Sequence, residues 1–537
     1  MAGSIKGRGA LSNPPGRFDK LTQTLEHDGW YEDEAPNKVE TIVMPEPARS
    51  IISRNNSPDI GFGQSINPYR GCEHACIYCV SGDTPILMAD GSTKTIAEIK
   101  VGDAIYGTTR VGAYLRYTKT QVLAHWSVIK PAYRVTLADG TTLVAGPDHR
   151  LLTDRGWKFV TGKMGGVGQR AHLTPNNKLL GTGRFASAVE KDADYRRGYL
   201  CGMIRGDGLL GSYHYERARG GGKDQHHCRL APCDFEALER CREYLRQFRV
   251  ETFEFEFAAA STNRQRMRGI RTYARSNVEE VRGIIAWPAA PTRQWHAGFL
   301  AGFFDAEGNY SRGVLRMSNT DRQIIAWLER SLTEFGFRYV VEHQHRVLTK
   351  PIDVVRLAGG LVEHLRFFHT VNPAITRKRE IAGQAIKSRA QLGVVSIEPI
   401  GKAMRLYDIT TGTEDFIANG VISHNCYARP SHAYVGLSPG LDFETRLFYK
   451  ADAAKLLEAE LSAPKYRCAP IMLGANTDPY QPLEKSLKVT RSILEVLVRC
   501  RHPVAITTKG ALVARDVDLL ATLAQDRLVQ VMFSIPT

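Results

Sequence analysis

The chain has 537 residues, which is too long for one ordinary hydrophobic core, so three or four domains are expected. Its hydrophobic fraction of 43% and charged fraction of 24% are typical of soluble globular proteins, and no apolar run approaches the roughly 18 residues that a membrane-spanning helix needs. The net charge of +15 favours a polyanionic partner, nucleic acid first, with a merely solvated basic surface as the alternative.

The first segment, MAGSIKGRGALSNPPGRFDK, is basic and rich in Gly and Pro, and no apolar stretch follows it. These features predict a flexible arm and not an export signal, so we expect a cytoplasmic protein whose thiols stay reduced. Ten cysteines in such a chain do not indicate a disulfide scaffold. Three of them, Cys72, Cys76 and Cys79, stand within eight residues, a spacing that predicts metal or nucleophile chemistry.

The character of the chain changes after Tyr78 and again at Cys426. The text that follows Tyr78, CVSGDTPILMADGSTKTIAEIKVGDAIYG, has short apolar runs between Asp-Gly and Gly-Asp turns, which predict a compact all-β domain. This pattern continues in YRVTLADGTTLVAGPDHRLLT, with a hairpin turn at Asp139-Gly140, and returns in VVSIEPIGKAMRLYDITTGTEDFIANGVISHN. Helical periodicity and many arginines mark the stretch between, and strands alternate with helices from Cys426 onward. The expected divisions are residues 1–78, 79–185, 186–388, 389–425 and 426–537.

The two outer pieces form one continuous motif when the middle is removed. Joining Tyr78 to Cys426 restores GCEHACIYCYARPSHAY, in which Cys426 takes the place of Cys79. Residues 79–425 are therefore predicted to be an insertion that interrupts a cysteine motif.

The residues at both ends of this insertion suit a self-catalysed excision. The Cys79 thiolate can attack the Tyr78 carbonyl and convert the peptide bond into a thioester, which a second thiol, Cys426, can accept. Asn425 can then cyclise onto its own carbonyl with help from His424, which releases the branched intermediate. A final S-to-N shift leaves a peptide bond between Tyr78 and Cys426.

The opening CVSGDTPILMADGSTKTIAEIKVGD and the closing FIANGVISHN before a cysteine resemble the first and last blocks of inteins of the Hint (hedgehog/intein) fold. The resemblance implies that His149 in GPDHRLLT polarises the N-terminal scissile amide and that Asp408 in LYDIT tunes Cys79. Two positions depart from the family pattern: Gly146 replaces a threonine and Glu414 replaces a histidine. The alternatives are a β-rich insertion with an accidental His-Asn-Cys, and a hedgehog-type autoprocessing domain, which lacks the terminal Asn and the following Cys.

Two similar segments, YLCGMIRGDG and FLAGFFDAEG, lie a hundred residues apart within residues 186–388. Each is predicted to be a short apolar helix with small residues four positions apart, which share one face and let two helices pack closely. Each ends in an acidic residue before a glycine, Asp207 in the first segment and Glu307 in the second. Packed helices should bring these carboxylates together, where they can share a divalent metal that activates water and stabilises the leaving oxygen of a phosphodiester.

These segments resemble the LAGLIDADG homing endonucleases in their single-chain, two-repeat form. The resemblance implies that Asp207 and Glu307 are catalytic acids, with Mg²⁺ as the cofactor and double-stranded DNA as the substrate. Arg205 departs from the acidic residue usual at its motif position. The arginine-rich TNRQRMRGIRTYARS suits contacts with DNA phosphates. The alternative is a decayed, inactive insertion that keeps the helix-packing motif.

The restored C-x3-C-x2-C motif consists of Cys72, Cys76 and Cys426, with Tyr78 just before the last cysteine. Three thiolates on one short loop can ligate three irons of a [4Fe–4S] cluster and leave the fourth iron open. We call residues 1–78 and 426–537, which flank the insertion, the host. With LGANTDPYQPLEK and ITTKGALVARDVDLLATLA downstream of the cysteine motif, the host resembles the radical SAM proteins, and within them the subgroup that contains spore photoproduct lyase. The resemblance implies S-adenosylmethionine as a second cofactor, bound at the open iron. The implied cofactor-binding side chains are Tyr78, Asn476, Thr477 and Asp478, with Lys509 and Arg515 as secondary candidates.

The alternative for the cysteine motif is a structural zinc site with His74 or His432 as the fourth ligand, although the second Cys-x2-Cys pair usual for zinc is missing. Cys468 and Cys500 stand alone and are predicted to be buried thiols. The chain ends near the fourth strand of a barrel that needs more strands, so we expect a truncated host domain whose substrate is unknown, possibly nucleic acid. The expected fold is thus multidomain: an all-β Hint domain carrying an inserted α+β LAGLIDADG endonuclease, flanked by halves of an α/β radical SAM partial barrel.

Overall fold

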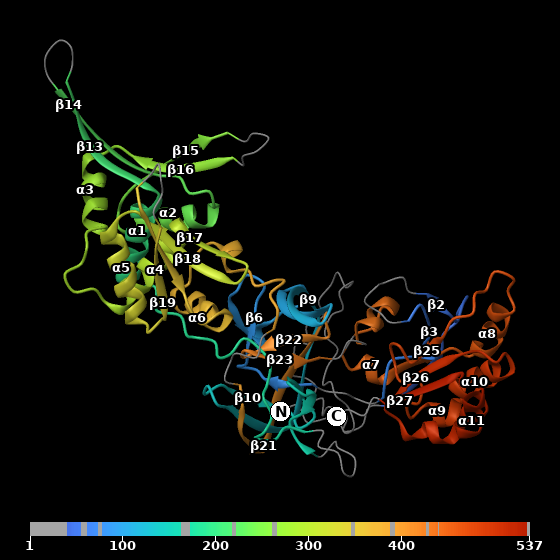
Figure 1. Ribbon diagram of the computed structural model, residues 1–537. Coiled ribbons are helices and arrows are strands. Elements are labelled where there is room, and N and C mark those ends of the chain that lie inside the picture. The colour runs from blue at the N-terminus through green and yellow to red at the C-terminus, as the bar shows by residue number, and fades with distance from the viewer. Residues whose placement is uncertain are drawn as a thin grey trace, which may run out of the picture. The chain divides into compact units, whose positions relative to one another are not determined.

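The computed structural model divides into two compact units (Figure 1). Unit 1 contains Met1–Met88, Thr93–Gly181 and Ile386–Thr537, and unit 2 contains Ala89–Ser92 and Thr182–Ala385. Within the described residues, no helix is both long enough and apolar enough to cross a membrane. The predicted N-terminal arm, His74, Cys76 and Cys426 lie outside these residues. The structure describes residues 40–54, 62–73, 78–162, 172–216, 222–259, 266–344, 350–386, 392–425, 429–438 and 440–533.

In unit 1, strands from both ends of the predicted insertion share the same sheets. One sheet has the order β10-β5-β21-β9-β8, and another has the order β12-β11-β23-β22-β6-β7. The predicted turn at Asp139-Gly140 is present between β9 and β10: Gly140 has a φ of 81°, and the Thr141 N–H donates to Asp139 Oδ1 at 2.9 Å. The elements are β5 (Val80–Ser81), β6 (Pro85–Leu87), β7 (Thr93–Thr95), η1 (Ile96–Glu98), β8 (Ala104–Val111), β9 (Tyr114–Leu137), β10 (Thr142–Ala145), β11 (Arg150–Thr153), β12 (Gly156–Phe159), β21 (Val394–Thr411), β22 (Asp415–Ala418) and β23 (Val421–His424).

The host strands of unit 1 come from before residue 79 and after residue 425. Strand β25 pairs in parallel with β3 on one side and with β26 on the other, and β26 pairs in parallel with β27. Parallel neighbours need a crossover connection, and the helices α10 and α11 lie in the connections that follow β25 and β26. The elements are β1 (Ile42–Pro45), β2 (Ser53–Arg54), β3 (Gln64–Ile66), β4 (Tyr69–Arg70), η4 (Arg429–Val435), α7 (Asp442–Thr445), β24 (Arg446–Tyr449), α8 (Ala453–Leu461), β25 (Ile471–Leu473), α9 (Glu484–Leu487), α10 (Val489–Arg499), β26 (Val504–Thr508), η5 (Ala511–Asp516), α11 (Val517–Gln525) and β27 (Val529–Phe533).

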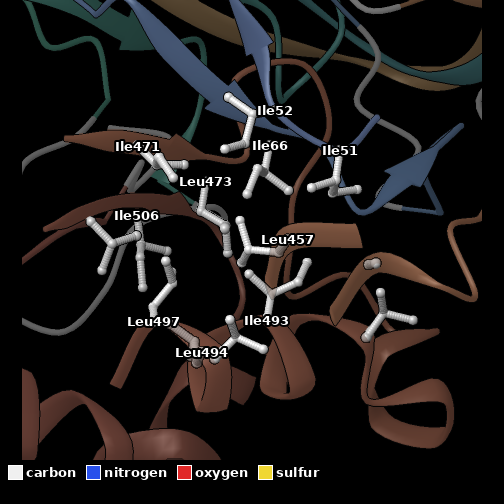
Figure 2. Packing of buried hydrophobic residues seen from close by; sticks show 14 of the residues in the cluster. Ile51, Ile52, Ile66, Leu457, Ile471, Leu473, Ile493, Leu494, Leu497 and Ile506 are labelled. Atoms are coloured by element: carbon white, nitrogen blue, oxygen red, sulfur yellow. The ribbon is translucent and has the colours of Figure 1, made fainter. Parts of the chain in front are cut away.

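The host sheet shares one apolar core with the helices α8 and α10 (Figure 2). Ile66, from before the insertion, is fully buried together with Leu473 and Ile506, from after it. Leu457 of α8 and Leu494 of α10 belong to the same buried cluster. Burying a side chain of this size stabilises a fold by about 1.5–3 kcal/mol. The core therefore depends on both outer segments of the chain at once.

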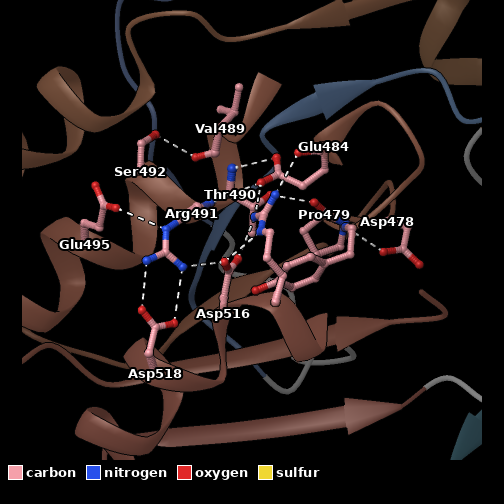
Figure 3. Close-up of polar contacts among 12 residues, drawn as sticks. Asp478, Pro479, Glu484, Val489, Thr490, Arg491, Ser492, Glu495, Asp516 and Asp518 are labelled. Atoms are coloured by element: carbon pink, nitrogen blue, oxygen red, sulfur yellow. Dashed lines mark hydrogen bonds and ion pairs between the residues drawn. The ribbon is translucent and has the colours of Figure 1, made fainter. Parts of the chain in front are cut away.

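Buried charges next to this core are paired (Figure 3). The fully buried Glu484 carboxylate accepts from the Thr490 N–H at 2.9 Å and from Arg515 Nη2 at 2.7 Å. Arg491 Nη1 donates to the equally buried Asp516 at 2.8 Å. A buried carboxylate without such partners would cost several kcal/mol, so these arginines hold the start of α10 against η5. Arg515, a secondary candidate for cofactor binding, belongs to this network.

Unit 2 contains the same arrangement twice. One sheet has the order β13-β14-β16-β15, and the other has the order β17-β18-β20-β19. Each sheet follows a long helix, α1 or α4, whose last residue directly precedes the first strand. The elements are α1 (Ala193–Asp207), β13 (Gly208–Glu216), β14 (Gly222–Leu230), α2 (Phe235–Gln247), β15 (Phe253–Ala258), β16 (Met267–Thr272), α3 (Arg275–Ile284), α4 (Arg293–Glu307), β17 (Gly308–Ser311), β18 (Val314–Asn319), α5 (Arg322–Glu334), β19 (Tyr339–Gln344), β20 (Ile352–Leu357), α6 (Leu361–Val371) and η3 (Thr376–Arg379).

Helices α1 and α4 pack directly against each other, backbone to backbone (Figure 1). A Cβ atom added to Gly302 would overlap the carbonyl oxygen of Tyr199, and one added to Gly202 would overlap the backbone of Phe303. The helices also begin alike, because the side chains of Asp192 and Thr292 each accept from a backbone N–H three residues later. Glycines at these positions let the helix axes approach closely, as the repeated motif predicts.

Candidate functional sites

The N-terminal end of the predicted insertion is held by backbone pairing on both sides. In the antiparallel registers, Tyr407 of β21 and Ala145 of β10 lie opposite Val80. Cys79, one residue earlier, therefore lies beside Asp408 and Gly146. The Gly146 N–H donates to the Cys79 carbonyl at 2.9 Å, and the Tyr78 N–H donates to Asp408 Oδ2 at 3.3 Å. The peptide bond between Tyr78 and Cys79 is thus fixed inside the β domain.

Burial favours the uncharged form of both ionisable groups at this position. Burial, and then the charge of Asp408, raises the pKa of the Cys79 thiol well above its ordinary value. Burial also raises the pKa of Asp408 well above the usual range, although Arg429 and the N–H groups of Ile409 and Tyr78 oppose this. A protonated thiol is a poor nucleophile, so reaction requires a proton acceptor or a stabilising charge nearby. A carboxyl group with a raised pKa beside the thiol suits proton exchange.

His149 lies at the same peptide bond. It is fully buried, just before β11, and its ring is close to the backbone of Tyr78. Burial lowers the pKa of His149 to about 3, and the neighbouring Tyr78 backbone opposes the shift. The imidazole is therefore neutral at physiological pH and has one donor and one acceptor nitrogen. The intein resemblance implied a histidine at this peptide, and the structure brings His149 there.

The C-terminal end of the insertion reaches the same place. The ring centroids of His424 and Tyr78 are 4.7 Å apart, although the two residues are 346 positions apart in the chain (424 minus 78). The ring of Trp157 contacts His424 at 4.9 Å between centroids. Burial lowers the pKa of His424 to about 3, so its imidazole is also neutral. The two junctions of the predicted insertion are therefore neighbours in the folded chain.

Asn425 is fully buried and its side-chain amide is held at both ends. In the amide orientation that satisfies its neighbours, the nitrogen donates to the Glu414 carbonyl at 3.2 Å, and the oxygen accepts from Thr411 Oγ1 at 2.9 Å and from Thr411 N at 3.2 Å. Glu414 has a φ of 64°, which turns its carbonyl toward Asn425, whose own N–H also donates to it at 3.0 Å. Sequence reasoning missed Thr411, whose signal was its place in the polar turn TTGTED. Cys426 lies outside the described residues.

In unit 2, Asp207 and Glu307 end α1 and α4 at the point where these helices meet. A Cβ atom on Gly206 would lie 3.3 Å from Glu307 Cγ, which shows how close the two helix ends are. Burial raises the pKa of both carboxyl groups, and the charge of Asp207 raises the pKa of Glu307 further. Two partly buried carboxylates that repel each other form an oxygen site that a hard divalent cation would neutralise, so the residues present fit Mg²⁺.

Lys378 is a further charged group at this pair, and sequence reasoning missed it. Its Nζ donates to the carbonyl oxygens of Asp305 at 2.6 Å and Phe304 at 3.2 Å, at the end of α4. Its charge lowers the pKa of both Asp207 and Glu307 and so partly offsets their burial. The lysine comes from η3, far along the chain, where no local pattern links it to the helices.

Arg205 and Asp305 occupy the same position in the two repeats but have different roles. Arg205 donates from Nε and Nη2 to the Ile285 carbonyl at 3.1 and 2.8 Å and stacks over the Trp287 ring. The buried Asp305 carboxylate accepts from the Tyr199 hydroxyl at 2.7 Å and from the backbone N–H groups of residues 374 and 375. Neither side chain joins the acidic pair. The departure at Arg205 therefore concerns helix anchoring.

In the host part of unit 1, Cys72 follows β4, and its N–H donates to the Phe443 carbonyl at 3.0 Å. The side chain of Gln481 spans this loop, because it accepts from the Glu73 N–H at 3.2 Å and donates to the Gly71 carbonyl at 3.4 Å. Sequence reasoning missed Gln481. Cys76 and Cys426 lie outside the described residues, so the structure describes the predicted thiolate set only at Cys72.

The predicted cofactor-binding residues after β25 make hydrogen bonds within the protein. The Asn476 N–H donates to Asn67 Oδ1 at 2.7 Å, and the Thr477 hydroxyl donates to the Tyr69 carbonyl at 2.7 Å. The Asp478 carboxylate accepts from the Thr508 hydroxyl at 2.7 Å and from the Lys509 N–H at 2.5 Å. These contacts tie the end of β25 to β4 on one side and to β26 on the other.

Two predictions about histidine and cysteine have clear structural outcomes. His432, a candidate zinc ligand, is buried, and its Nε2 donates to the Arg446 carbonyl at 2.8 Å. Cys468 and Cys500 are exposed, so the prediction that they are buried was wrong. Cys500 follows the last residue of α10 on its solvent side, and Cys468 lies in the segment before β25, where neither thiol faces the core.

Comparison with known proteins finds a family match within unit 2. Residues 294–363 match the LAGLIDADG-like domain. This segment is therefore similar to that family. It begins at α4 and continues through the second sheet into α6.

Relatives and solved structures also match parts of the chain. Uncharacterized proteins of Mycobacterium tuberculosis and Mycobacterium bovis are 40% identical over 110 residues, which is 20% of this chain and 32% of theirs. The replicative DNA helicase DnaB of Rhodothermus marinus is 30% identical over 138 residues, or 25% of this chain and 14% of that protein. The homing endonuclease I-DmoI, in complex with DNA and Mn, has 15% identity and a TM-score of 0.27, and the match covers 34% of this chain and 97% of that one. The N-terminal LAGLIDADG domain of DUF199/WhiA has 13% identity and a TM-score of 0.25, with coverage of 34% and 82%.

The raised pKa values of the acidic pair lead to a stability prediction. Asp207→Asn should raise the unfolding free energy of unit 2 at pH 8 by about 0.5–2 kcal/mol, because it removes one of two repelling, partly buried charges. Since the folded-state pKa values are raised, the cost of these charges is absent below the unfolded-state values and grows as pH rises through the folded-state values. The gain should therefore disappear near pH 4. Hydrogen exchange of residues 193–207 and 293–307, without divalent cations, measures this change in unfolding free energy.

The matched control for this prediction is Asp305→Asn. Its carboxylate also has a raised pKa from burial, but it accepts hydrogen bonds from Tyr199 and the backbone. Losing these acceptor contacts should destabilise unit 2 by about 1–3 kcal/mol. Equal effects of both substitutions would contradict the assignment of Asp207 to a repelling pair.

Proposed function

We propose that the chain is a precursor that undergoes intein-mediated protein splicing, with residues 79–425 as a Hint-fold intein. The observation that carries this proposal is the convergence of both junctions: the rings of Tyr78 and His424 are 4.7 Å apart. Only a chemistry that joins the flanking segments needs a nucleophile after Tyr78, an asparagine at residue 425 and a thiol directly beyond it. These three residue types stand at those positions.

The residues at the junctions support an order of steps. Asp408, whose pKa burial raises, lies beside Cys79 and is suited to exchange the thiol proton, and the neutral His149 at the Tyr78 backbone is suited to polarise the amide by a hydrogen bond. The resulting thioester would be attacked by Cys426. Thr411 and the Glu414 carbonyl orient the Asn425 amide, whose nitrogen would then attack its own carbonyl carbon. Glu414 replaces the family histidine, so its backbone takes part where a side chain is usual.

We further propose that the excised intein is a site-specific DNA endonuclease. Support comes from the LAGLIDADG-like domain in residues 294–363 and from the adjacent carboxylates of Asp207 and Glu307. Mg²⁺ held by these carboxylates would supply an activated water and charge neutralisation at a phosphodiester. Exposed arginines on the strands of both sheets suit contacts with double-stranded DNA: Arg229, Arg268, Arg316 and Arg356. The homing endonuclease I-DmoI has been solved in complex with DNA and Mn.

For the host, we propose a radical SAM protein with a [4Fe–4S] cluster, of a reaction class like that of spore photoproduct lyase. Support comes from the restored cysteine motif and from the parallel β3-β25-β26-β27 sheet, which uses strands from both flanking segments. Cys72, Cys76 and Cys426 would hold the cluster. Gln481 fixes the backbone around Cys72. The segment after β25 adjoins that loop through Thr477 and Tyr69.

Expressed protein should separate into a 347-residue intein and a 190-residue ligated product (537 minus 347), since both nucleophiles and Asn425 are intact. Intact mass measures this directly. Changing Cys79→Ala together with Asn425→Ala should leave the 59.8 kDa precursor, because neither junction can then be broken. A wild-type chain that stays full length after long incubation in reductant would falsify the splicing proposal.

Purified intein with Mg²⁺ should cut a plasmid that carries the intein-less junction encoding CIYCYARP. Asp207→Asn or Glu307→Gln should abolish cutting, because either change removes charge from the shared site, yet splicing should continue. Glu280→Gln, an exposed acid on α3, is the matched control and should cut normally. Normal splicing with no cutting by the wild-type protein would mean that the endonuclease is inactive.

Anaerobic reconstitution of the ligated product should yield about four irons and four sulfides per chain, with a spectrum that S-adenosylmethionine perturbs. Cys72→Ser should lose the cluster. Cys500→Ser serves as the control, because its exposed thiol lies at the end of α10, outside the cysteine motif. Stoichiometric zinc without iron would instead indicate a structural site.

A further inference from the structure

Gly146 stands where the intein pattern has a threonine. Two other side chains lie in the space that the threonine side chain would fill. A Cβ atom on Gly146 would lie 3.2 Å from Asp148 Oδ1 and 3.3 Å from Lys130 Cε. Lys130 Nζ and Asp148 Oδ1 form an ion pair here, and both side chains are largely buried. Gly146 itself donates to the Cys79 carbonyl. A charged pair thus fills the space where the intein pattern has a hydroxyl group.

Lys130 reaches this space from the strand that faces Cys79. Val128 and Ala132 of β9 form a buried cluster with Cys79 and Leu406. Successive side chains of a strand point to opposite faces, so residues 128, 130 and 132 share one face. Lys130 therefore projects on the side of β9 that carries the Cys79 cluster. A lysine between two buried apolar residues on one face needs a specific partner, and Asp148 is that partner.

The charges around Cys79 have opposite effects on a developing thiolate. Asp408 and Asp148 are acidic neighbours that disfavour it, whereas Lys130 and Arg429 favour it. Arg429 belongs to the segment after the junction and is already paired with the buried Glu444. Lys130 belongs to the intein itself. Lys130 also acts on His149, whose positive form it disfavours, so it helps to keep that imidazole neutral.

We propose that Lys130 takes over the part of the missing threonine: its ammonium group stabilises the negative charge that develops when Cys79 attacks Tyr78. This inference rests on the proposed splicing function and concerns its first step. In that step the Cys79 sulfur bonds to the Tyr78 carbonyl carbon and the carbon–nitrogen bond breaks. The thiol proton ends on the released amine of Cys79, so no other reactant is consumed. Lys130 acts through its charge and keeps its own proton.

The test isolates this step in the full chain with Asn425→Ala and Cys426→Ala. Added dithiothreitol then cleaves the thioester and releases residues 1–78, and the cleavage rate is followed from pH 6 to 10. Lys130→Met should slow cleavage at pH 7 by about tenfold or more, which corresponds to at least one pKa unit of the thiol. The rate should recover toward that of the parent at high pH, which shows that the variant is folded. Lys130→Arg should stay within about threefold of the parent.

Asp148→Asn separates a charge effect from a structural one. It breaks the same ion pair but removes an acidic neighbour of Cys79, so cleavage should be at least as fast as in the parent. Lys94→Met, which breaks a comparable pair with Asp103 in the same domain, should not change the rate. The inference is overturned if Lys130→Met keeps the parent's rate and pH profile, if its rate does not recover at high pH, or if Asp148→Asn is equally slow. A parent without any thiol-dependent cleavage would overturn the splicing proposal as well.

Discussion

The short antiparallel pairing of β5 with β21 is the constraint on which the rest of unit 1 depends. Two residues of β5 pair with Leu406 and Tyr407, and this register sets Cys79 beside Asp408. A shift by one residue would turn Cys79 to the opposite face of the sheet and separate it from both Asp408 and the Lys130 side of β9. Because β21 also ends near Thr411, the same strand carries groups for both junctions. One strand therefore links the two ends of the insertion.

This convergence explains how a host domain can fold around a long insertion. Since Tyr78 and His424 are neighbours, the flanking segments leave the β domain from nearly the same point. The sheet can then pair β3 with β25 although Ile66 and Ile471 are 405 positions apart (471 minus 66). Ile66 is buried with Leu473 and Ile506 in that sheet, so this core is assembled across the insertion. The proposed joining of the two flanking segments would need no rearrangement of these strands.

The two proposed catalytic centres use burial in opposite ways. Around Cys79, burial favours the uncharged forms of the thiol, Asp408 and two histidines, an environment that disfavours isolated charges. At the ends of α1 and α4, burial acts on two carboxylates that repel each other, and a bound cation would neutralise their charge. The first arrangement suits acid–base chemistry on a peptide. The second suits metal-dependent chemistry on a phosphate ester.

Candidate functional residues that stand in a local sequence pattern could be predicted without a structure. The restored cysteine motif, the His424-Asn425 ending and the repeated segments that end in Asp207 and Glu307 are all local patterns, and their chemistry follows from residue type and spacing. The helix pairing was likewise predictable, because small residues four positions apart share a face. For the same reason the hairpin at Asp139-Gly140 was predictable from its turn residues.

Other residues became visible only in the tertiary structure. Lys130, Thr411, Lys378 and Gln481 lie far in sequence from the groups they serve, and no periodicity in their own segments points to those groups. The exposure of Cys468 and Cys500 was also mispredicted, because burial depends on which side of an element meets the core. Sequence by itself determined which residue types stand at the proposed junctions and at the helix ends. Strand register and helix packing decided which charges surround them, because contacts across strands join residues that the chain order keeps apart.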